Sequence, residues 1–166
     1  MTVEELNKQL MNPKMLLNNT RANRSAFSVA LNNEKTLSCF DVLSRSRVII
    51  YKHVLLNLGG GYNVQTGVFT VPRSGVYSLA VSIYGPGLSG RTQPTCADLQ
   101  VNGKTVAGLF EKTGLDNEDS NTVVVAVQLK AGDIVTVSLP DGCIVCDDTN
   151  HFNTFTGFLL YSTDKM

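Results

Sequence analysis

Four cysteines carry most of the reactive side-chain chemistry in this 166-residue sequence. They allow two disulfides, a zinc site with four thiolate ligands, or free buried thiols. Only Cys143 and Cys146 have the Cys-x-x-Cys spacing of a zinc knuckle, while Cys39 and Cys96 lie far from them and from each other. The spacing therefore favours disulfides over zinc, and it leaves free thiols open as an alternative.

A catalytic dyad or triad would have to use one of the two histidines, His53 and His151. His53 lies in a strand-like segment, and we interpret it as structural. His151 follows Cys146 closely, so a Cys-His pair is an alternative, although a cysteine with this spacing is more often oxidised. Asp147 and Asp148 are adjacent, too close to serve as separate acid and base. We predict that the protein is not an enzyme.

A glycine cluster at Gly59, Gly60 and Gly61 resembles a phosphate-binding loop. Such a loop needs a helix after it, whose free N–H groups hold the anion. Here β-branched and aromatic residues broken by turn residues follow, and no Gly-Lys-Ser/Thr motif accompanies them. The cluster therefore indicates turns between strands.

The charge balance argues against nucleic-acid binding, because 14 basic and 14 acidic residues give a formal net charge of zero. No apolar run reaches the ~18 residues of a membrane span, so we predict no membrane insertion. Residues 1–20 also lack the apolar core of a signal peptide. The sequons Asn18-Asn19-Thr20 and Asn23-Arg24-Ser25 nevertheless favour secretion. The signal peptide is absent from this chain, either because it was removed or because the protein never had one.

Residues 1–25 form a leader that we expect to be helical or disordered. Apolar residues recur in it at helical spacing, namely at Val3, Leu6 and Leu10. Thr2 and Glu5 match a capping box, and Pro13 is expected to limit the length of the helix. The leader is either a frayed tail, the simpler interpretation, or the end of a coiled coil that joins subunits.

Residues 26–166 read as a single all-β domain. Asn102-Gly103 predicts a two-residue hairpin turn, and residues 122–129 and 134–139 predict a second hairpin around the turn at residues 130–133. Short strands separated by turns, with no long helix between them, are typical of a β-sandwich or jelly roll.

Two motifs in this domain resemble the globular head of the complement C1q family. The first motif comprises Tyr51, Asn57, Tyr62, Phe69, Gly75 and Tyr77 at the family spacing, and the second is the closing segment at residues 155–161. Tyr51 replaces a usual phenylalanine, and Leu79 and Val81 replace usual aromatic residues. The resemblance implies a jelly-roll sandwich of the C1q and tumour-necrosis-factor type, assembled as a homotrimer, here without a preceding collagen repeat.

The last strand independently supports assembly, because residues 152–161 carry apolar side chains on both faces. One face can fill the core, whereas the other needs a partner or covering loops. The residues predicted for the trimer interface or the core are Phe152, Phe155, Phe158, Leu160 and Tyr161. The family strand order also implies a disulfide between Cys96 and either Cys143 or Cys146.

Recognition residues are expected in the loops at the ends of the sandwich. The candidates for ligand binding are Arg91, Asp116, Glu118, Asp119, Asp147, Asp148 and Asn150. Asp116, Asp147 and Asp148 are also candidates for calcium, which some family members carry, although solvated loops without metal are an alternative.

These features together predict a secreted, non-enzymatic, lectin-like protein of innate immunity that recognises microbial carbohydrate or lipopolysaccharide. The alternatives are a cytokine-like trimeric ligand for a cell-surface receptor and a structural extracellular protein.

Overall fold

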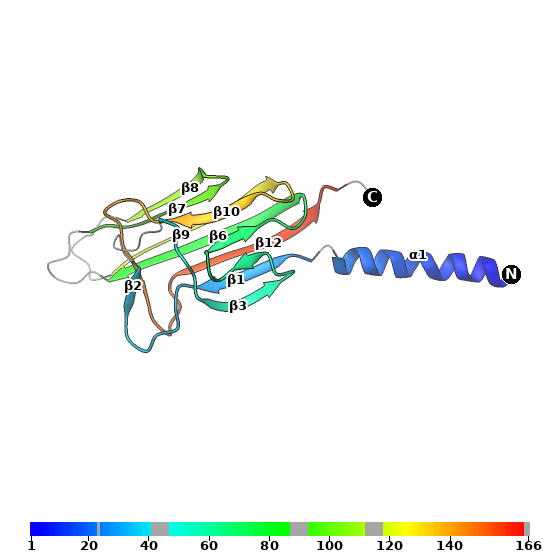
Figure 1. The fold of residues 1–166 in the computed structure, drawn as a ribbon, viewed down its shortest axis with the longest axis horizontal. Helices are drawn as coiled ribbons and strands as arrows, with labels where there is room; N and C mark the ends of the chain where they lie inside the picture. Colours follow the sequence, from blue (N-terminus) through cyan, green and yellow to red (C-terminus); the bar gives the residue numbers. More distant parts are fainter. Residues whose placement is uncertain (23, 41–46, 87–92, 112–117, 165–166) are drawn as a thin grey trace.

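The described part of the chain forms a β-sandwich, and a helix projects from the end of this sandwich (Figure 1). The computed structural model describes residues 1–22, 24–40, 47–86, 93–111 and 118–164. The helix α1 spans Val3–Ala22, and the capping box is formed, because Glu5 N donates to Thr2 Oγ1 at 3.3 Å and Thr2 N donates to Glu5 Oε2 at 2.9 Å. The helix continues through Pro13, so the expectation that this residue limits its length is wrong.

The first sheet has five strands in the order β3-β1-β12-β6-β9, and all its pairings are antiparallel. These strands are β1 (Ala26–Ala30), β3 (His53–Leu58), β6 (Gly75–Pro86), β9 (Glu118–Leu129) and β12 (Thr154–Ser162). Along β6 every second residue is buried, which is the pattern of a strand with one face on the core.

The second sheet also has five strands, in the order β4-β5-β10-β7-β8. These strands are β4 (Tyr62–Asn63), β5 (Val68–Thr70), β7 (Thr95–Val101), β8 (Lys104–Glu111) and β10 (Ile134–Ser138). Two five-stranded antiparallel sheets with crossing connections confirm the jelly-roll prediction.

One predicted hairpin is confirmed and the other is wrong. β7 pairs with β8 around Asn102 and Gly103, whose φ values of 50° and 78° are those of a tight hairpin turn. By contrast, β9 pairs with β6, and β10 pairs with β5 and β7, in the other sheet. The turn at residues 130–133 therefore carries the chain from one sheet to the other, a connection that alternating patterns alone do not distinguish from a hairpin.

The core between the sheets is built around Phe27. Its ring centroid lies 4.3 Å from that of Phe69 and 4.7 Å from that of Phe155. Tyr51 and Tyr77 complete the group of fully buried large aromatic side chains. Phe155 thus places one of the two apolar faces of the closing strand β12 in the core.

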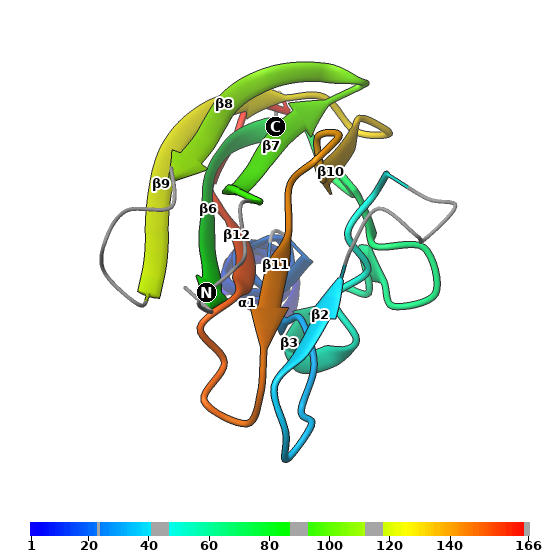
Figure 2. The same cartoon turned by 90° about the vertical axis from the view of Figure 1, so that its left-hand side faces the viewer.

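A short strand pair crosses the end of the sandwich away from α1 (Figures 1 and 2). It consists of β2 (Ser38–Phe40) and β11 (Val145–Asp147), which run antiparallel with Cys39 opposite Cys146. We call this region, together with the turn at residues 148–151, the loop end of the protein.

Candidate functional site

Two disulfides fix the loop end. Cys96 on β7 is bonded to Cys143, one of the two partners that the family strand order implies. Cys39 on β2 is bonded to Cys146 on β11. This pairing was not predicted, because it depends on a register between two segments whose cysteines are 107 residues apart. The Cys143-Ile-Val-Cys146 segment is therefore anchored at both ends, and Cys146 has no thiol for a Cys-His pair.

Asp147 is a structural residue at the start of the turn. Its side chain is fully buried, and its oxygens accept hydrogen bonds from the backbone N–H groups of Asp148 (3.0 Å), Phe152 (2.8 Å) and Asn153 (3.3 Å). Burial raises the pKa of Asp147, and these hydrogen bonds partly oppose that change. A carboxylate with three backbone donors inside the protein organises the turn and is not directed at a ligand.

Asn153 connects the same turn to β6 by hydrogen bonds, and the sequence analysis did not predict this role. The side chain is fully buried. Its Oδ1 accepts from Tyr84 N at 2.9 Å, and its Nδ2 donates to Tyr84 O at 3.2 Å and to Cys146 O. The sequence alone does not distinguish a buried asparagine that binds three main-chain groups from an asparagine in an exposed turn, where this residue type is also common.

The remaining ligand candidates are dispersed. Arg91 and Asp116 lie outside the described residues, and Glu118 begins β9. Asp119, the next residue on β9, has only 2% of its surface exposed. Asp148 and Asn150 do share the turn, where Asn150 N donates to Asp148 Oδ1 at 2.7 Å.

The two histidines also meet at the loop end. Their rings stack with centroids 4.7 Å apart and planes 13° from parallel. Across the described residues, no three His, Cys, Asp or Glu side chains converge to form a metal site. For calcium, the donors of the turn fit only in part, because Asp147 already accepts backbone donors, which leaves Asp148, Asn150 and main-chain carbonyls.

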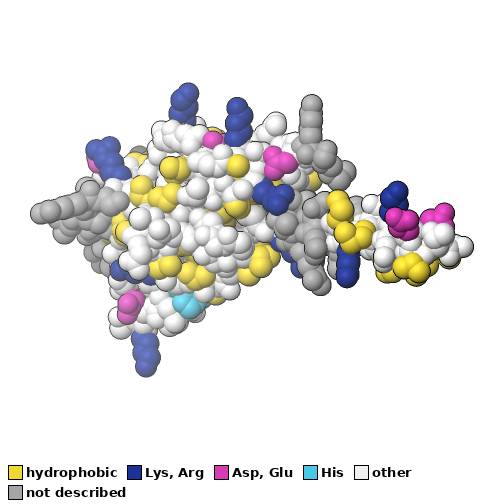
Figure 3. Space-filling model, turned by 45° about the vertical axis from the view of Figure 1, so that its right-hand side comes forward, with side chains coloured by type: hydrophobic (Ala, Val, Ile, Leu, Met, Phe, Trp, Pro, Cys, Tyr) yellow, Lys and Arg dark blue, Asp and Glu magenta, His cyan; other side chains and the backbone are white. Residues whose placement is uncertain are grey.

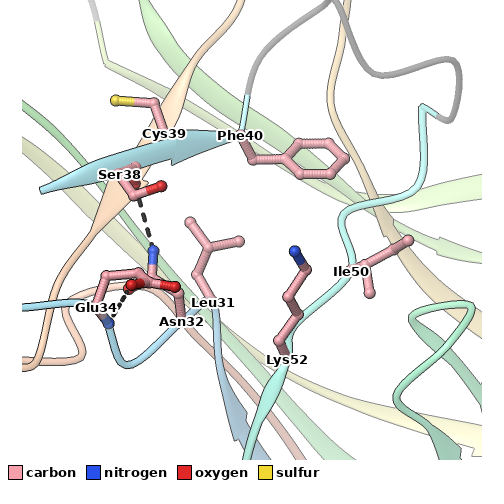
Figure 4. A pocket seen from close by; sticks show the side chains of 8 residues that line it. All are labelled: Leu31, Asn32, Glu34, Ser38, Cys39, Phe40, Ile50 and Lys52. Atoms are coloured by element: carbon pink, nitrogen blue, oxygen red, sulfur yellow. Dashed lines mark hydrogen bonds between the residues drawn. The ribbon is translucent and has the colours of Figure 1, made fainter.

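A hollow of about 80 Å³ lies beside this turn, between β2 and the segment that leads into β3 (Figure 4). It is lined by Leu31, Asn32, Glu34, Ser38, Cys39, Phe40, Ile50 and Lys52. The Lys52 ammonium points into the hollow, and the Phe40 ring forms part of its wall. Within the described part of the chain, neither Lys52 nor Glu34 forms an ion pair, so both charges are available to a ligand.

Asn32 holds the hollow in shape. Its Nδ2 donates to Ser38 O at 3.4 Å and to Asp147 O at 3.2 Å, and its Oδ1 accepts from Glu34 N at 3.1 Å. Lys52 is fixed by its main chain, since Lys52 N donates to Leu31 O at 3.0 Å. The hollow and the turn of Asp147 are thus parts of one hydrogen-bonded unit.

The central part of the outward face of the first sheet is unusual in its lack of charge. We call it the uncharged face, and it comprises Leu56 and Leu58 on β3, Ala26 and Ser28 on β1, Thr154, Thr156 and Phe158 on β12, Ser78, Ala80 and Ser82 on β6, and Thr122, Val124 and Ala126 on β9. None of these positions holds Asp, Glu, Lys or Arg. Large apolar side chains are exposed on it, with 44% of Phe158 and 65% of Val124 accessible. An uncharged face on which large apolar side chains are exposed between serine and threonine residues is suited to a protein interface.

The other apolar residues predicted in the closing segment are also exposed, with 47% of Phe152, 50% of Leu160 and 61% of Tyr161 accessible. Phe152 packs against Tyr84, with ring centroids 4.7 Å apart. A register shift between Leu159 and Tyr161 interrupts the alternation of β12, which explains why Tyr161 does not share the buried face of Phe155.

Comparison with protein families decides the identity of this domain. The model of the C1q domain matches residues 26–160. The chain belongs to the C1q domain family. None of the helices in the described part of the chain is both long and apolar enough to cross a membrane.

Relatives of this C1q domain include "Complement C1q tumor necrosis factor-related protein 3" from human, 33% identical over 117 residues, and the mouse protein of that name, 30% identical over 115 residues. Each match covers 69% of this chain and 45% of the relative, so the C1q domain chain spans less than half the length of these relatives.

Solved structures share the fold of this C1q domain. They include the globular domain of the zebrafish complement 1qA protein, with a TM-score of 0.59, 17% identity, and coverage of 84% of this chain and 99% of that chain. The Eiger TNF structure from S. frugiperda has a TM-score of 0.66 and 16% identity, and covers 86% of this chain and 96% of that chain.

The C1q motif residues have clear structural roles. The side-chain amide of Asn57 forms hydrogen bonds with both main-chain polar groups of Tyr62. Asn57 Nδ2 donates to Tyr62 O at 2.9 Å, and Tyr62 N donates to Asn57 Oδ1 at 3.1 Å. Tyr77 Oη donates to Arg73 O at 2.8 Å. At Gly75 a Cβ would lie 2.5 Å from Tyr161 O, so this close approach of β6 to β12 requires glycine.

Proposed function

We propose that this protein is an extracellular, non-enzymatic, homotrimeric recognition protein that binds microbial carbohydrate or lipopolysaccharide at its loop end. The observation that carries the ligand proposal is the hollow beside β2, in which an aromatic ring, an ammonium group and a carboxylate surround a small apolar floor.

The side chains of this hollow suit sugar chemistry. The Phe40 ring offers an apolar face to the C–H groups of a sugar ring, and Glu34 can accept hydrogen bonds from hydroxyl groups. The Lys52 ammonium can pair with a carboxylate or phosphate on an acidic glycan or lipopolysaccharide. A hollow of about 80 Å³ admits a terminal group of such a ligand and not a whole chain.

Assembly and location rest on separate observations. The uncharged face is suited to burial against other copies of the chain, and membership of the C1q family supports three copies. Two disulfides support an oxidising, extracellular environment. Three copies of one weak site raise the apparent affinity for a repetitive surface by ~100-fold or more when the spacing allows.

The test is binding to immobilised bacterial polysaccharides and lipopolysaccharide, with and without competing free sugar. Lys52→Ala should weaken binding to anionic glycans, and added salt should weaken it further by screening. Lys104→Ala, at an exposed lysine on β8, is the matched control and should bind like the wild type.

Three results would change the proposal. Equal binding by Lys52→Ala and Lys104→Ala would move the site away from the hollow. An absence of any glycan binding, together with sugar-independent capture by a cell-surface receptor, would favour the cytokine-like alternative. Loss of binding on chelation would support calcium in the turn, where Asp148→Asn should then reduce binding and leave the fold intact.

A further inference from the structure

The helix α1 is exposed over the part in which its side chains are described, residues 3–15. Every side chain from residue 3 to residue 15 is exposed, so this part of the helix does not pack on the sandwich. Figure 3 shows apolar side chains on its surface beside lysine and glutamate side chains. Exposed apolar residues include Val3 (79%), Leu6 (46%) and Leu10 (57%).

A single helix of this kind is marginal in water. Isolated helices become stable only above ~12–15 residues even in favourable sequences, and tertiary packing normally supplies most of their stability. This helix has 20 residues, but Pro13 removes one backbone hydrogen bond from its middle. A helix with such a weakness needs a partner along its apolar stripe.

The spacing of the stripe identifies the kind of partner. Val3, Leu6 and Leu10 are separated by three and four residues, and the same seven-residue repeat reaches Pro13 and Leu17 in the sequence. This repeat places apolar residues at the a and d positions of a coiled coil, the pattern by which helices pack in parallel with copies of themselves.

The charges of α1 argue against a lipid surface as the partner. Glu4 and Glu5 lie in the first turn, and Lys8 and Lys14 follow, so the polar faces carry mixed signs. A helix that binds anionic membranes is instead rich in lysine and arginine on its polar face. The positions that flank the first layers, Asn7 and Gln9, are neutral and do not repel one another between parallel copies.

The connection to the sandwich brings copies of α1 to one place. The chain enters β1 directly after the helix, and Leu159 N donates to Ser25 O at 2.9 Å, which holds this entry beside β12. Both strands belong to the sheet that bears the uncharged face. Three subunits that meet through this face therefore have their helices start at the same end of the assembly.

We propose that α1 packs against α1 of two further copies of this chain as a parallel three-stranded coiled coil. This proposal rests on the homotrimer of the proposed function. Leu6 and Leu10, which precede Pro13 in α1, form its main contact layers.

The experiment uses the full chain with one added cysteine. Leu6→Cys places a thiol in the proposed seam, and Lys8→Cys places one on the outer surface of the same turn. Treatment with a short bismaleimide, followed by a denaturing gel, should give roughly tenfold more covalent dimer for Leu6→Cys, because seam residues face each other and outer residues do not.

Sedimentation of the wild type separates the two proposals. A trimer in which both variants cross-link equally poorly would overturn the coiled coil and leave the trimeric assembly in place. A wild type that sediments as a monomer would overturn both. As an independent check, Leu6→Asp with Leu10→Asp should reduce the helical circular dichroism and leave the thermal unfolding of the β-sandwich unchanged, whereas unchanged helicity would count against the coil.

Discussion

The hydroxyl of Tyr62 forms two hydrogen bonds with the main chain of Tyr51. Tyr62 Oη donates to Tyr51 O at 2.8 Å and accepts from Tyr51 N at 3.0 Å. The hydroxyl of Tyr51, in contrast, is buried and has no hydrogen-bond partner among the described residues. Burial raises the pKa of the Tyr51 hydroxyl, as expected for a group without compensating contacts. The hydrogen-bonded hydroxyl of Tyr62 is therefore expected to stabilise the fold, whereas the unpartnered hydroxyl of Tyr51 is expected to destabilise it.

We predict that Tyr62→Phe and Tyr51→Phe change stability in opposite directions. Tyr62→Phe leaves a buried N–H and C=O without partners, which should cost about 1–3 kcal/mol. Tyr51→Phe removes an unpartnered hydroxyl and should stabilise by about 1 kcal/mol. Chemical denaturation of both variants measures this, with Tyr161→Phe as a control at an exposed position. Equal losses in both variants would refute the assignment.

The disulfides should map as Cys39 with Cys146 and Cys96 with Cys143. Digestion without reduction, followed by mass spectrometry, reads these pairs directly. Replacing Cys96 and Cys143 together with serine should cost about 4 kcal/mol on the chain-entropy model, because the bond closes a loop of 47 residues. Four free thiols in protein purified from an oxidising compartment would contradict both pairs.

Asp133 should contribute a pH-dependent part of the stability. Hydrogen bonds from Lys130 N at 2.8 Å and from Asn102 Nδ2 at 3.0 Å lower the pKa of this carboxyl. A lowered native pKa means that the stabilisation is complete above the unfolded value of about 4 and disappears as the pH falls through the native value. The difference in melting temperature between wild type and Asp133→Asn should therefore shrink on acidification below about pH 4. A constant difference at every pH would exclude this role.

Phe158→Glu should dissociate the proposed trimer without unfolding the subunit. The side chain lies on the uncharged face and is 44% exposed in the single chain, so a carboxylate there remains solvated in the monomer and is buried only in the assembly. Light scattering should change from about three times 18.0 kDa to the mass of one chain. Gln100→Glu, opposite Thr136 on the other sheet, is the control and should stay trimeric. Dissociation of both variants would indicate a general effect of charge.

The sequence predicted those parts of the fold whose signals are local. The Asn102-Gly103 turn was recognised because both residues accept positive φ, and the core face of β12 was recognised from its apolar parity. The pairing of β9 and β10 was wrong, since strand pairing between sheets depends on the path of the chain at residues 130–133 and not on alternation.

The candidate site was predicted less well than the fold. Asp147 lies in a sequence typical of an exposed acidic turn, but its carboxylate is buried and accepts hydrogen bonds from three backbone N–H groups. Lys52 and Phe40 come from separate segments, and only the β2-β11 pair and its disulfide bring them to one hollow. Residue spacing in a single sequence does not predict that two such distant residues line the same hollow.

The antiparallel pairing of β1 with β12 has a practical consequence. Because Ala26 lies opposite Phe158, the chain enters and leaves the sandwich at the same end, away from β2 and the hollow (Figure 1). A fluorophore, affinity handle or sensor surface attached after residue 164 would thus leave the hollow exposed to the solution. Protein immobilised in this way should therefore bind the proposed ligands as well as soluble protein does, a convenient property for a biosensor format.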